Sequence, residues 1–191
     1  MVEQWNRCVG YANGEWVCLL ADDDVYKPDF LQDLLLLTEK YPQCDVFRSR
    51  VDIVEGNGRF VDFYPSSPEY ESVEEYLWHV LKKYRRQTIS EFMIRADVIR
   101  RRGGYEYCPL AWGSDYLSIM KFATLSGIVT SSKIYTQYRD SGENISSNRD
   151  KYLVEKLKAI GIFYNKMDEW IVANASDFYK PVLPVFRDFY L

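Results

Sequence analysis

The sequence contains one histidine and four cysteines among its 191 residues, and this scarcity excludes several kinds of site. Cys8, Cys18, Cys44 and Cys108 lie far apart without a Cys-x-x-Cys spacing, so the sequence indicates neither a structural zinc site nor a disulfide framework. The lone His79 lies off the apolar stripe of its predicted helix. That position favours a solvated side chain over a metal ligand or a catalytic base.

Long hydrophobic runs and an excess of positive charge are also missing. The longest unbroken apolar run, residues 16–21, is far shorter than the roughly 18 residues that a membrane-spanning helix needs. The first seven residues lead into no apolar core of the length that a secretory signal needs, so we expect a cytoplasmic protein. A net charge of -4 gives no global attraction to phosphate backbones, so we expect no nucleic-acid partner. The basic clusters 82–86 and 100–102 fit either solvated helix ends or a site for an anion such as a diphosphate or a lipid headgroup.

What remains is the composition of a folded domain, with 47% apolar and 27% charged residues. Apolar periodicity and turn residues predict alternating strands and helices, which is typical of an α/β fold. Pro28 is expected at the first position of its helix. The predicted helices span 3–13, 28–40, 72–84, 114–126 and 150–173, and the extended segments span 16–21, 46–55, 59–63, 92–94 and 128–138. The last helix should bury Leu153, Leu157, Ile160, Tyr164, Met167 and Ile171.

Three consecutive carboxylates, Asp22, Asp23 and Asp24, follow the strand at 16–21. In open α/β sheets ligands bind outside the carboxyl ends of the strands, and neighbouring like charges need to be neutralised. A hard divalent cation, Mn²⁺ or Mg²⁺, needs few protein carboxylates when a substrate diphosphate supplies further oxygens. The triplet therefore predicts a metal-diphosphate site, and a solvated acidic turn before a helix is the alternative.

The stretch from Gly14 to Leu31 resembles the segment around the DxD motif of family 2 glycosyltransferases, which have the GT-A fold. The resemblance implies inverting, metal-dependent transfer from a nucleotide-diphosphate sugar to a hydroxyl of a saccharide acceptor, in surface polysaccharide biosynthesis. By position, it implies that Asp23 and Asp24 bind Mn²⁺ or Mg²⁺ and that Asp22 and Asp23 bind the nucleotide sugar. Ala21 stands where the family has its first aspartate.

A second match begins with Gly103-Gly104-Tyr105 and continues from Ala111 to Leu117. It resembles the family's acid pair, which opens a helix after a glycine-rich, aromatic loop. Asp115 matches the catalytic base, which takes the proton of the acceptor hydroxyl as that oxygen attacks the anomeric carbon. From the pattern alone, the alternative is a helix N-terminus at which Ser114 caps and Asp115 favours the dipole.

Two further groups belong to the site that the resemblance implies. Residues 135–146 resemble the family's mobile loop after the last core strand, where Arg139 would meet the diphosphate; a polar surface turn is the alternative. Trp112 and Tyr107 flank Asp115, and their rings would stack on the sugar acceptor unless they serve core packing.

The resemblance covers residues 4–146 and lacks the family's first nucleotide-binding strands. We expect a GT-A-like mixed sheet flanked by helices, with a partial glycosyltransferase core at 1–146 and a C-terminal helical appendage at 147–191. The uncovered edge of the strand at 16–21 predicts a homodimer or a swapped element. The aromatic end of the appendage, with Phe186 and Phe189, packs on its own domain or on a second copy, or docks at the inner face of a membrane.

Two functional hypotheses follow. The first is the inverting, metal-dependent sugar transferase described above. The second is a catalytically inactive, truncated glycosyltransferase that acts as an oligomerising or interaction module. A metal-dependent phosphatase would need a nucleophilic aspartate, a second acid two residues on and a downstream lysine with an acid cluster, and the sequence arranges no such set convincingly.

Overall fold

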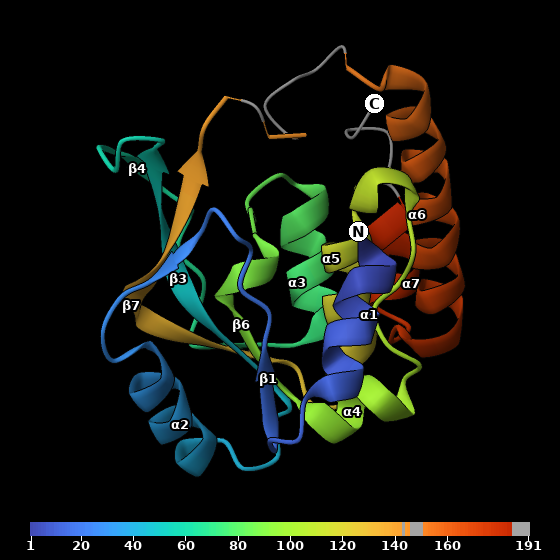
Figure 1. Cartoon of the computed structure of the whole chain (residues 1–191). Helices are drawn as coiled ribbons and strands as arrows, with labels where there is room; N and C mark the ends of the chain where they lie inside the picture. Colours follow the sequence, from blue (N-terminus) through green and yellow to red (C-terminus); the bar gives the residue numbers. More distant parts are fainter. Residues whose placement is uncertain (143, 146–150, 185–191) are drawn as a thin grey trace.

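A seven-stranded mixed sheet organises the chain, and helices cover both of its faces (Figure 1). The computed structural model describes residues 1–142, 144–145 and 151–184. The strand order is β1-β6-β3-β7-β2, with β4 paired to β3 and β5 paired to β7. This architecture confirms the predicted α/β class. The strands are β1 (Trp16–Cys18), β2 (Val25–Tyr26), β3 (Val46–Glu55), β4 (Phe60–Phe63), β5 (Tyr70–Glu71), β6 (Phe92–Arg95) and β7 (Ile128–Asp140).

Strands β3 and β7 form a parallel pair at the centre of the sheet, and the other pairs described are antiparallel. The register of this central pair shifts between Arg48 and Val51. Such irregularities bend a strand and increase its twist. The first half of β3 pairs with β6 and its second half pairs with β4, so the sheet curls along the length of its central strand.

The helices separate the apolar side chains into two main cores. Helix α2 (Phe30–Lys40) covers one face, where Phe30 and Leu34 pack with Phe47 of β3. The other helices lie over the opposite face and share the larger core (Figure 1). They are α1 (Val2–Tyr11), α3 (Val73–Leu81), α4 (Ala96–Arg101), α5 (Ser114–Ala123), α6 (Leu153–Asn174) and α7 (Tyr179–Val182), with single 3-10 turns η1 (Ile89–Glu91) and η2 (Pro109–Ala111).

Helix α3 begins where the sequence predicts, but it ends at Leu81 instead of Tyr84. Ser72 caps it: its hydroxyl accepts from the N–H of Glu75, whose carboxylate accepts from the N–H of Ser72. This capping box satisfies two backbone donors that the helix leaves unpaired. The apolar side chains at helical spacing are buried, among them Tyr76, Leu77 and Val80.

Three local expectations are corrected. The first strand ends at Cys18 instead of Ala21, because the N–H of Ala21 donates to the hydroxyl of Ser90 at 3.0 Å, outside the strand ladder. Helix α2 begins at Phe30 after a left-handed Asp29, so Pro28 precedes the helix. Gly113 occupies the N-cap of α5, and the hydroxyl of Ser114 instead accepts from the N–H of Cys108 at 2.9 Å.

The buried face of α6 matches the prediction in part, because Tyr164, Met167 and Ile171 are buried. Leu153 and Leu157 are exposed, whereas Ala159 and Phe163 are buried in the larger core. Lys156 is also buried, and its ammonium donates to the carbonyl of Ile145 at 2.8 Å. The expected boundary at 146–147 and the aromatic end with Phe186 and Phe189 lie outside the described residues. Among the described helices, none has the length and apolar character needed to cross a membrane.

Candidate active site

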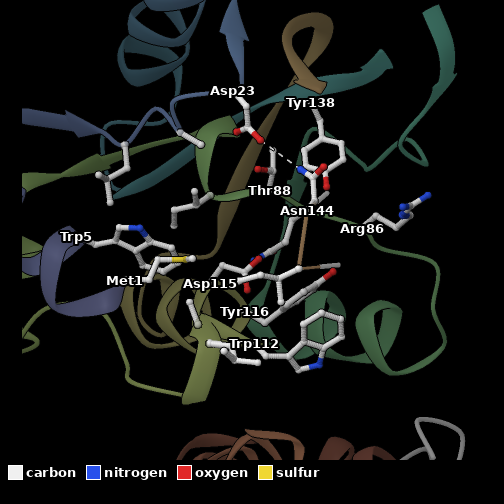
Figure 2. Close-up of a pocket in the computed structure, with 18 of the residues that line it drawn as sticks. Met1, Trp5, Asp23, Arg86, Thr88, Trp112, Asp115, Tyr116, Tyr138 and Asn144 are labelled. Carbon is white, nitrogen blue, oxygen red and sulfur yellow. Dashed lines mark hydrogen bonds between the residues drawn. The ribbon is translucent and has the colours of Figure 1, made fainter. Parts of the chain in front are cut away.

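A pocket of about 990 Å³ lies between the end of β1, the start of α5 and helix α1 (Figure 2). Asp23 and Asp115, which are far apart in the sequence, both line it. The volume is in the range of sites that enclose organic ligands. The structure therefore brings the predicted metal ligand and the predicted base to one cavity, as their proposed roles require.

The three acids after β1 have different environments. Asp22 and Asp23 line the pocket, whereas Asp24 is buried and is not part of the lining. One oxygen of Asp24 accepts from the hydroxyl of Thr88 at 3.2 Å, and the other accepts from the N–H of Arg139 at 3.2 Å. Burial raises the pKa of Asp24. Asp24 thus anchors the acidic loop to η1 and β7, and the structure does not bring it to the position predicted for a metal ligand.

Asp23 is contacted by a residue that the sequence did not single out. The side-chain amide of Asn144 donates to Asp23 Oδ2 at 3.3 Å (Figure 2). The same amide donates to the carbonyl of Arg139 at 3.2 Å, and its oxygen accepts from the N–H of Ser141 at 3.0 Å. Asn144 therefore joins the segment after β7 to the acidic loop. The resemblance of residues 135–146 to a mobile loop marks this segment but not this side chain.

Two of the predicted ligand-binding side chains do not line the pocket. Arg139 contributes its backbone N–H to Asp24, and its Nε is buried without a hydrogen-bond partner within the described part of the chain. Tyr107 lies in the loop before η2 with 58% of its surface exposed. The lining includes neither residue, so the pocket as it stands gives no contact for Arg139 on a diphosphate or for Tyr107 on an acceptor.

The carboxylates at the pocket fit one kind of metal site only. Within the described ranges, no three His, Cys, Asp or Glu side chains converge on a point that would hold an ion. Asp22 and Asp23 offer hard carboxylate oxygens to the cavity. This donor set fits Mn²⁺ or Mg²⁺ that takes its remaining ligands from substrate oxygens and water, and it does not fit a cage built by the protein alone.

Asp115 lies at the first turn of α5, which starts at the left-handed Gly113. A side chain at Gly113 would be strained at φ +81° and would approach Phe163 of α6 to 3.1 Å, so glycine is required where α5 meets α6. Burial raises the pKa of Asp115 to about 6, against hydrogen bonds from Gln87 and from the N–H groups of Tyr116 and Asp115. A carboxylate that titrates there is ionised at neutral pH and still basic, which suits a general base.

The loop before α5 is strained where it meets the pocket. Leu110 and Ala111 both line the cavity, and both have left-handed backbones, with φ of 59° and 58°. This conformation is uncommon for residues with a Cβ, and such strain clusters at functional sites. Trp112 follows them and lies below Asp115 and Tyr116 in the view of Figure 2. The ammonium of Lys156 lies 4.6 Å from the centroid of the Trp112 ring and supports it from α6.

The remaining walls differ in polarity. Met1, Trp5 and Cys8 of the α1 region line an apolar side together with Leu19 and Leu20. Figure 2 shows Trp5 and Arg86 on opposite sides of Asp115.

The basic cluster at 82–86 divides between two roles. Lys83 and Arg86 line the pocket, and the Arg86 guanidinium lies 5.0 Å from the centroid of the Tyr64 ring. Arg85 is buried and pairs with Glu71 at 2.9 Å. The cluster is thus neither wholly a solvated helix end nor wholly an anion site.

Comparison with solved structures gives the class of fold. The mixed sheet resembles the GT-A glycosyltransferase TarS of S. aureus: the crystal structure of residues 1–349 matches with a TM-score of 0.52 at 17% identity over 90% of this chain and 58% of that chain. A second TarS crystal structure matches with a TM-score of 0.52 at 16% identity, over 96% of this chain and 39% of that chain. At these identities the likeness concerns the fold alone.

The sequence identifies the family. The profile of glycosyl transferase family 2 matches residues 2–107, and the chain belongs to this family. The amylovoran biosynthesis glycosyltransferase AmsB of Erwinia amylovora is 38% identical over 79 residues, which are 38% of this chain and 26% of AmsB. The match therefore spans about a quarter of that relative. The family profile includes the acidic loop and ends before Asp115, so this match does not test the predicted role of Asp115.

Proposed function

We propose that the protein transfers a sugar from a nucleotide-diphosphate donor to a hydroxyl of a saccharide acceptor, with inversion at the anomeric carbon. The observation that carries the proposal is the shared pocket of Asp23 and Asp115. Membership in glycosyl transferase family 2 supports the reaction class, and a relative named for amylovoran biosynthesis supports a role in polysaccharide biosynthesis.

On the donor side, the acidic loop faces the diphosphate. Asp23 would hold Mn²⁺ or Mg²⁺, and Asp22 would contact the nucleotide beside it. When bound, this cation supplies positive charge that stabilises the leaving diphosphate. Asp24 keeps the loop in place through its bonds to Thr88 and to the backbone of Arg139.

On the acceptor side, Trp112 would bind the sugar and Asp115 would accept the proton of its hydroxyl. Trp112 offers a flat ring at the pocket on which a sugar can stack. As the acceptor oxygen forms its bond to the anomeric carbon, the bond from that carbon to the diphosphate oxygen breaks, and the hydroxyl proton passes to the carboxylate of Asp115. The nucleotide diphosphate leaves with the electron pair, so one displacement inverts the centre.

Release of nucleotide tests this proposal. The protein is incubated with Mn²⁺, a panel of UDP- and GDP-hexoses and oligosaccharide acceptors, beside Asp23→Asn, Asp115→Asn and the control Asp62→Asn, an exposed aspartate of β4. We expect acceptor-dependent release for the wild type and the control, and a loss of at least 100-fold for both pocket variants. Activity that survives both substitutions would contradict the proposal, and no release from any donor would favour the inactive interaction module.

We further propose that a second copy covers the edge of β1, because this strand pairs with β6 alone among the described strands. An unpaired strand edge is a template for association. Light scattering should then give a dimer, with the amides of residues 16–18 protected from hydrogen exchange. A monomer with rapidly exchanging amides would contradict this proposal.

The proposed transfer reaction also predicts a cytoplasmic location, with peripheral association at the inner face of the membrane.

A further inference from the structure

Gln87 lies between α3 and η1 and joins Asp115 to the interior of the protein. Its amide nitrogen donates to Asp115 Oδ2 at 3.1 Å, and its amide oxygen accepts from the hydroxyl of Tyr76. Tyr76 is a fully buried residue of α3, and Gln87 itself is 8% exposed. Three side chains from three segments of the chain thus form one line of hydrogen bonds that ends at the pocket.

The chemistry of these groups fixes the direction of the bonds. An ionised carboxylate can only accept, so the NH₂ of Gln87 must face Asp115. The amide oxygen then faces Tyr76, whose hydroxyl can donate to it. Burial raises the pKa of Tyr76 well above its usual value, so that the hydroxyl keeps its proton throughout the physiological range. The Tyr76 hydroxyl therefore locks the amide of Gln87 in the orientation that serves an ionised Asp115.

We propose that Gln87 and Tyr76 are positioning residues for Asp115: Gln87 holds the carboxylate by a donated hydrogen bond, and Tyr76 acts only through Gln87. This inference rests on the proposed role of Asp115 as the base. It gives a reason for a glutamine at a position where the sequence shows no motif, directly after the basic cluster 82–86.

The other ionisable groups around Asp115 do not obscure a change in the pKa of this carboxyl. Burial raises the pKa of Glu91 to about 8, and it also raises the pKa of Cys108, so both groups are largely protonated at pH 6. Tyr76 on α3, Glu91 in η1 and Cys108 before η2 interact electrostatically with Asp115. The other titratable or charged groups of the pocket lining are Tyr116 on α5, Asp22 and Asp23 after β1, and Lys83 and Arg86 after α3, and Lys156 of α6 lies over Trp112.

The direct test is the titration of Asp115 in the Gln87→Met variant, which keeps a side chain of similar length but lacks the donor. The carboxyl carbon is followed by NMR in protein labelled at aspartate and is assigned with Asp115→Asn. Because the hydrogen bond favours the ionised form, its loss should raise the pKa of Asp115 by about one unit. The acidic limb of kcat, measured with Mn²⁺ and the hexose donor of the release assay, should move upward by the same amount, while KM for the donor changes less than twofold.

Tyr76→Phe separates positioning from general support of the fold. Without the hydroxyl, the amide of Gln87 loses its orientation, so the titration should move in the same direction by a smaller amount. In the double variant Gln87→Met with Tyr76→Phe, the shift should equal that of Gln87→Met alone. Tyr105→Phe, which removes the hydroxyl of another buried tyrosine of the same core, should leave the titration unchanged. If Gln87→Met does not fold, Tyr76→Phe against Tyr105→Phe carries the test.

The outcomes distinguish the positioning role of Gln87 and Tyr76 from the proposed role of Asp115 as the base, on which it rests. An unchanged Asp115 titration in Gln87→Met, or shifts that add in the double variant, would overturn the positioning role even if Asp115→Asn is inactive. The expected titration shifts together with full transfer activity of Asp115→Asn would instead support the pair and overturn the proposed base. Matched shifts in the titration and in the kcat profile support both.

Discussion

Two charged regions of the molecule are built in opposite ways. In the buried cluster, Arg48 and Arg85 lie 2.7 and 2.9 Å from the two oxygens of Glu71. In the pocket, the described hydrogen-bonding side chains on Asp23 and Asp115 are the neutral amides of Asn144 and Gln87. Charge that is paired inside the protein holds elements of the fold together. A carboxylate that is held by neutral groups keeps its capacity to bind a cation or a proton, as the proposed roles of Asp23 and Asp115 require.

The buried cluster is also linked to the pocket by a chain of hydrogen bonds. Arg48 donates to Thr130 of β7 and contacts Glu91 of η1 at 3.4 Å. The second oxygen of Glu91 accepts from the N–H of Thr88, and the hydroxyl of Thr88 donates to Asp24. The cluster therefore fixes the segment that holds the acidic loop. The two regions should respond differently to the loss of a single carboxylate: one in stability, the other in activity.

The largest expected effect is that of Asp115→Asn on activity. Removing a general base should lower kcat on the order of 10² to 10⁴-fold. The fold should gain stability, because burial raises the folded-state pKa of this carboxyl to about 6, above its unfolded value. Its contribution to stability is present below pH 4 and lost as the pH rises through 6. Urea unfolding should show the variant about 3 kcal/mol more stable at pH 8 and no more stable at pH 4. Equal destabilisation at both pH values would contradict this account.

Glu71→Gln should have the reverse effect of Asp115→Asn: it should lower stability and leave kcat largely unchanged. It leaves Arg48 and Arg85 buried without their full partner, and breaking a buried ion pair costs about 3 to 5 kcal/mol. The measurement is urea unfolding at pH 7, with kcat determined well below the melting temperature. The matched control is Glu69→Gln, whose carboxylate pairs with Lys40 at the surface, and it should change stability by less than about 1 kcal/mol. Similar losses in the two variants would remove the distinction between the regions.

The acidic loop contains the same contrast between adjacent residues. Asp24→Ala should lower the free energy of unfolding by about 2 kcal/mol, because Thr88 and the N–H of Arg139 lose a buried acceptor. Asp23→Ala should leave the stability unchanged within about 0.5 kcal/mol. Thermal unfolding of the two variants without ligand checks this difference. A destabilised Asp23→Ala variant would show that both acids are structural.

The smallest expected effect concerns the acceptor wall. Trp112→Ala removes the ring at the pocket and should raise KM for the saccharide acceptor roughly tenfold, with KM for the donor little changed. Tyr107→Ala is the matched control, because Tyr107 is exposed and lies outside the lining. Initial rates at varied acceptor concentration give both values. An equal effect of Tyr107→Ala would restore the sequence-based prediction that both rings bind the acceptor.

Most helices and strands could be predicted because their signals are local. Ser72 and Glu75 define the start of α3, and Gly56-Asn57-Gly58 turns the chain between β3 and β4. The acidic loop followed a short apolar run and matched a family segment. These features depend on neighbouring residues, which the sequence displays in order.

The rest depends on partners far along the chain. At the start of α6, Lys156 is buried and lies over Trp112, whereas the apolar residues Leu153 and Leu157 are exposed. The division between Asp23 and Asp24 follows from Thr88, and Gln87 and Asn144 have no pattern that marks them. Hydrogen bonds between distant segments leave no periodicity, so these residues emerge only from the folded structure.

The central claim is that Asp23 and Asp115 serve the two halves of one reaction in a single pocket. The most direct measurement is calorimetric titration of UDP in the presence of Mn²⁺ into the wild type, Asp23→Ala and Asp115→Asn, with nucleotide release measured on the same samples. We predict binding heat for the wild type and Asp115→Asn, none for Asp23→Ala, and release by the wild type only. Undiminished heat in Asp23→Ala, or undiminished release by Asp115→Asn, would contradict the claim.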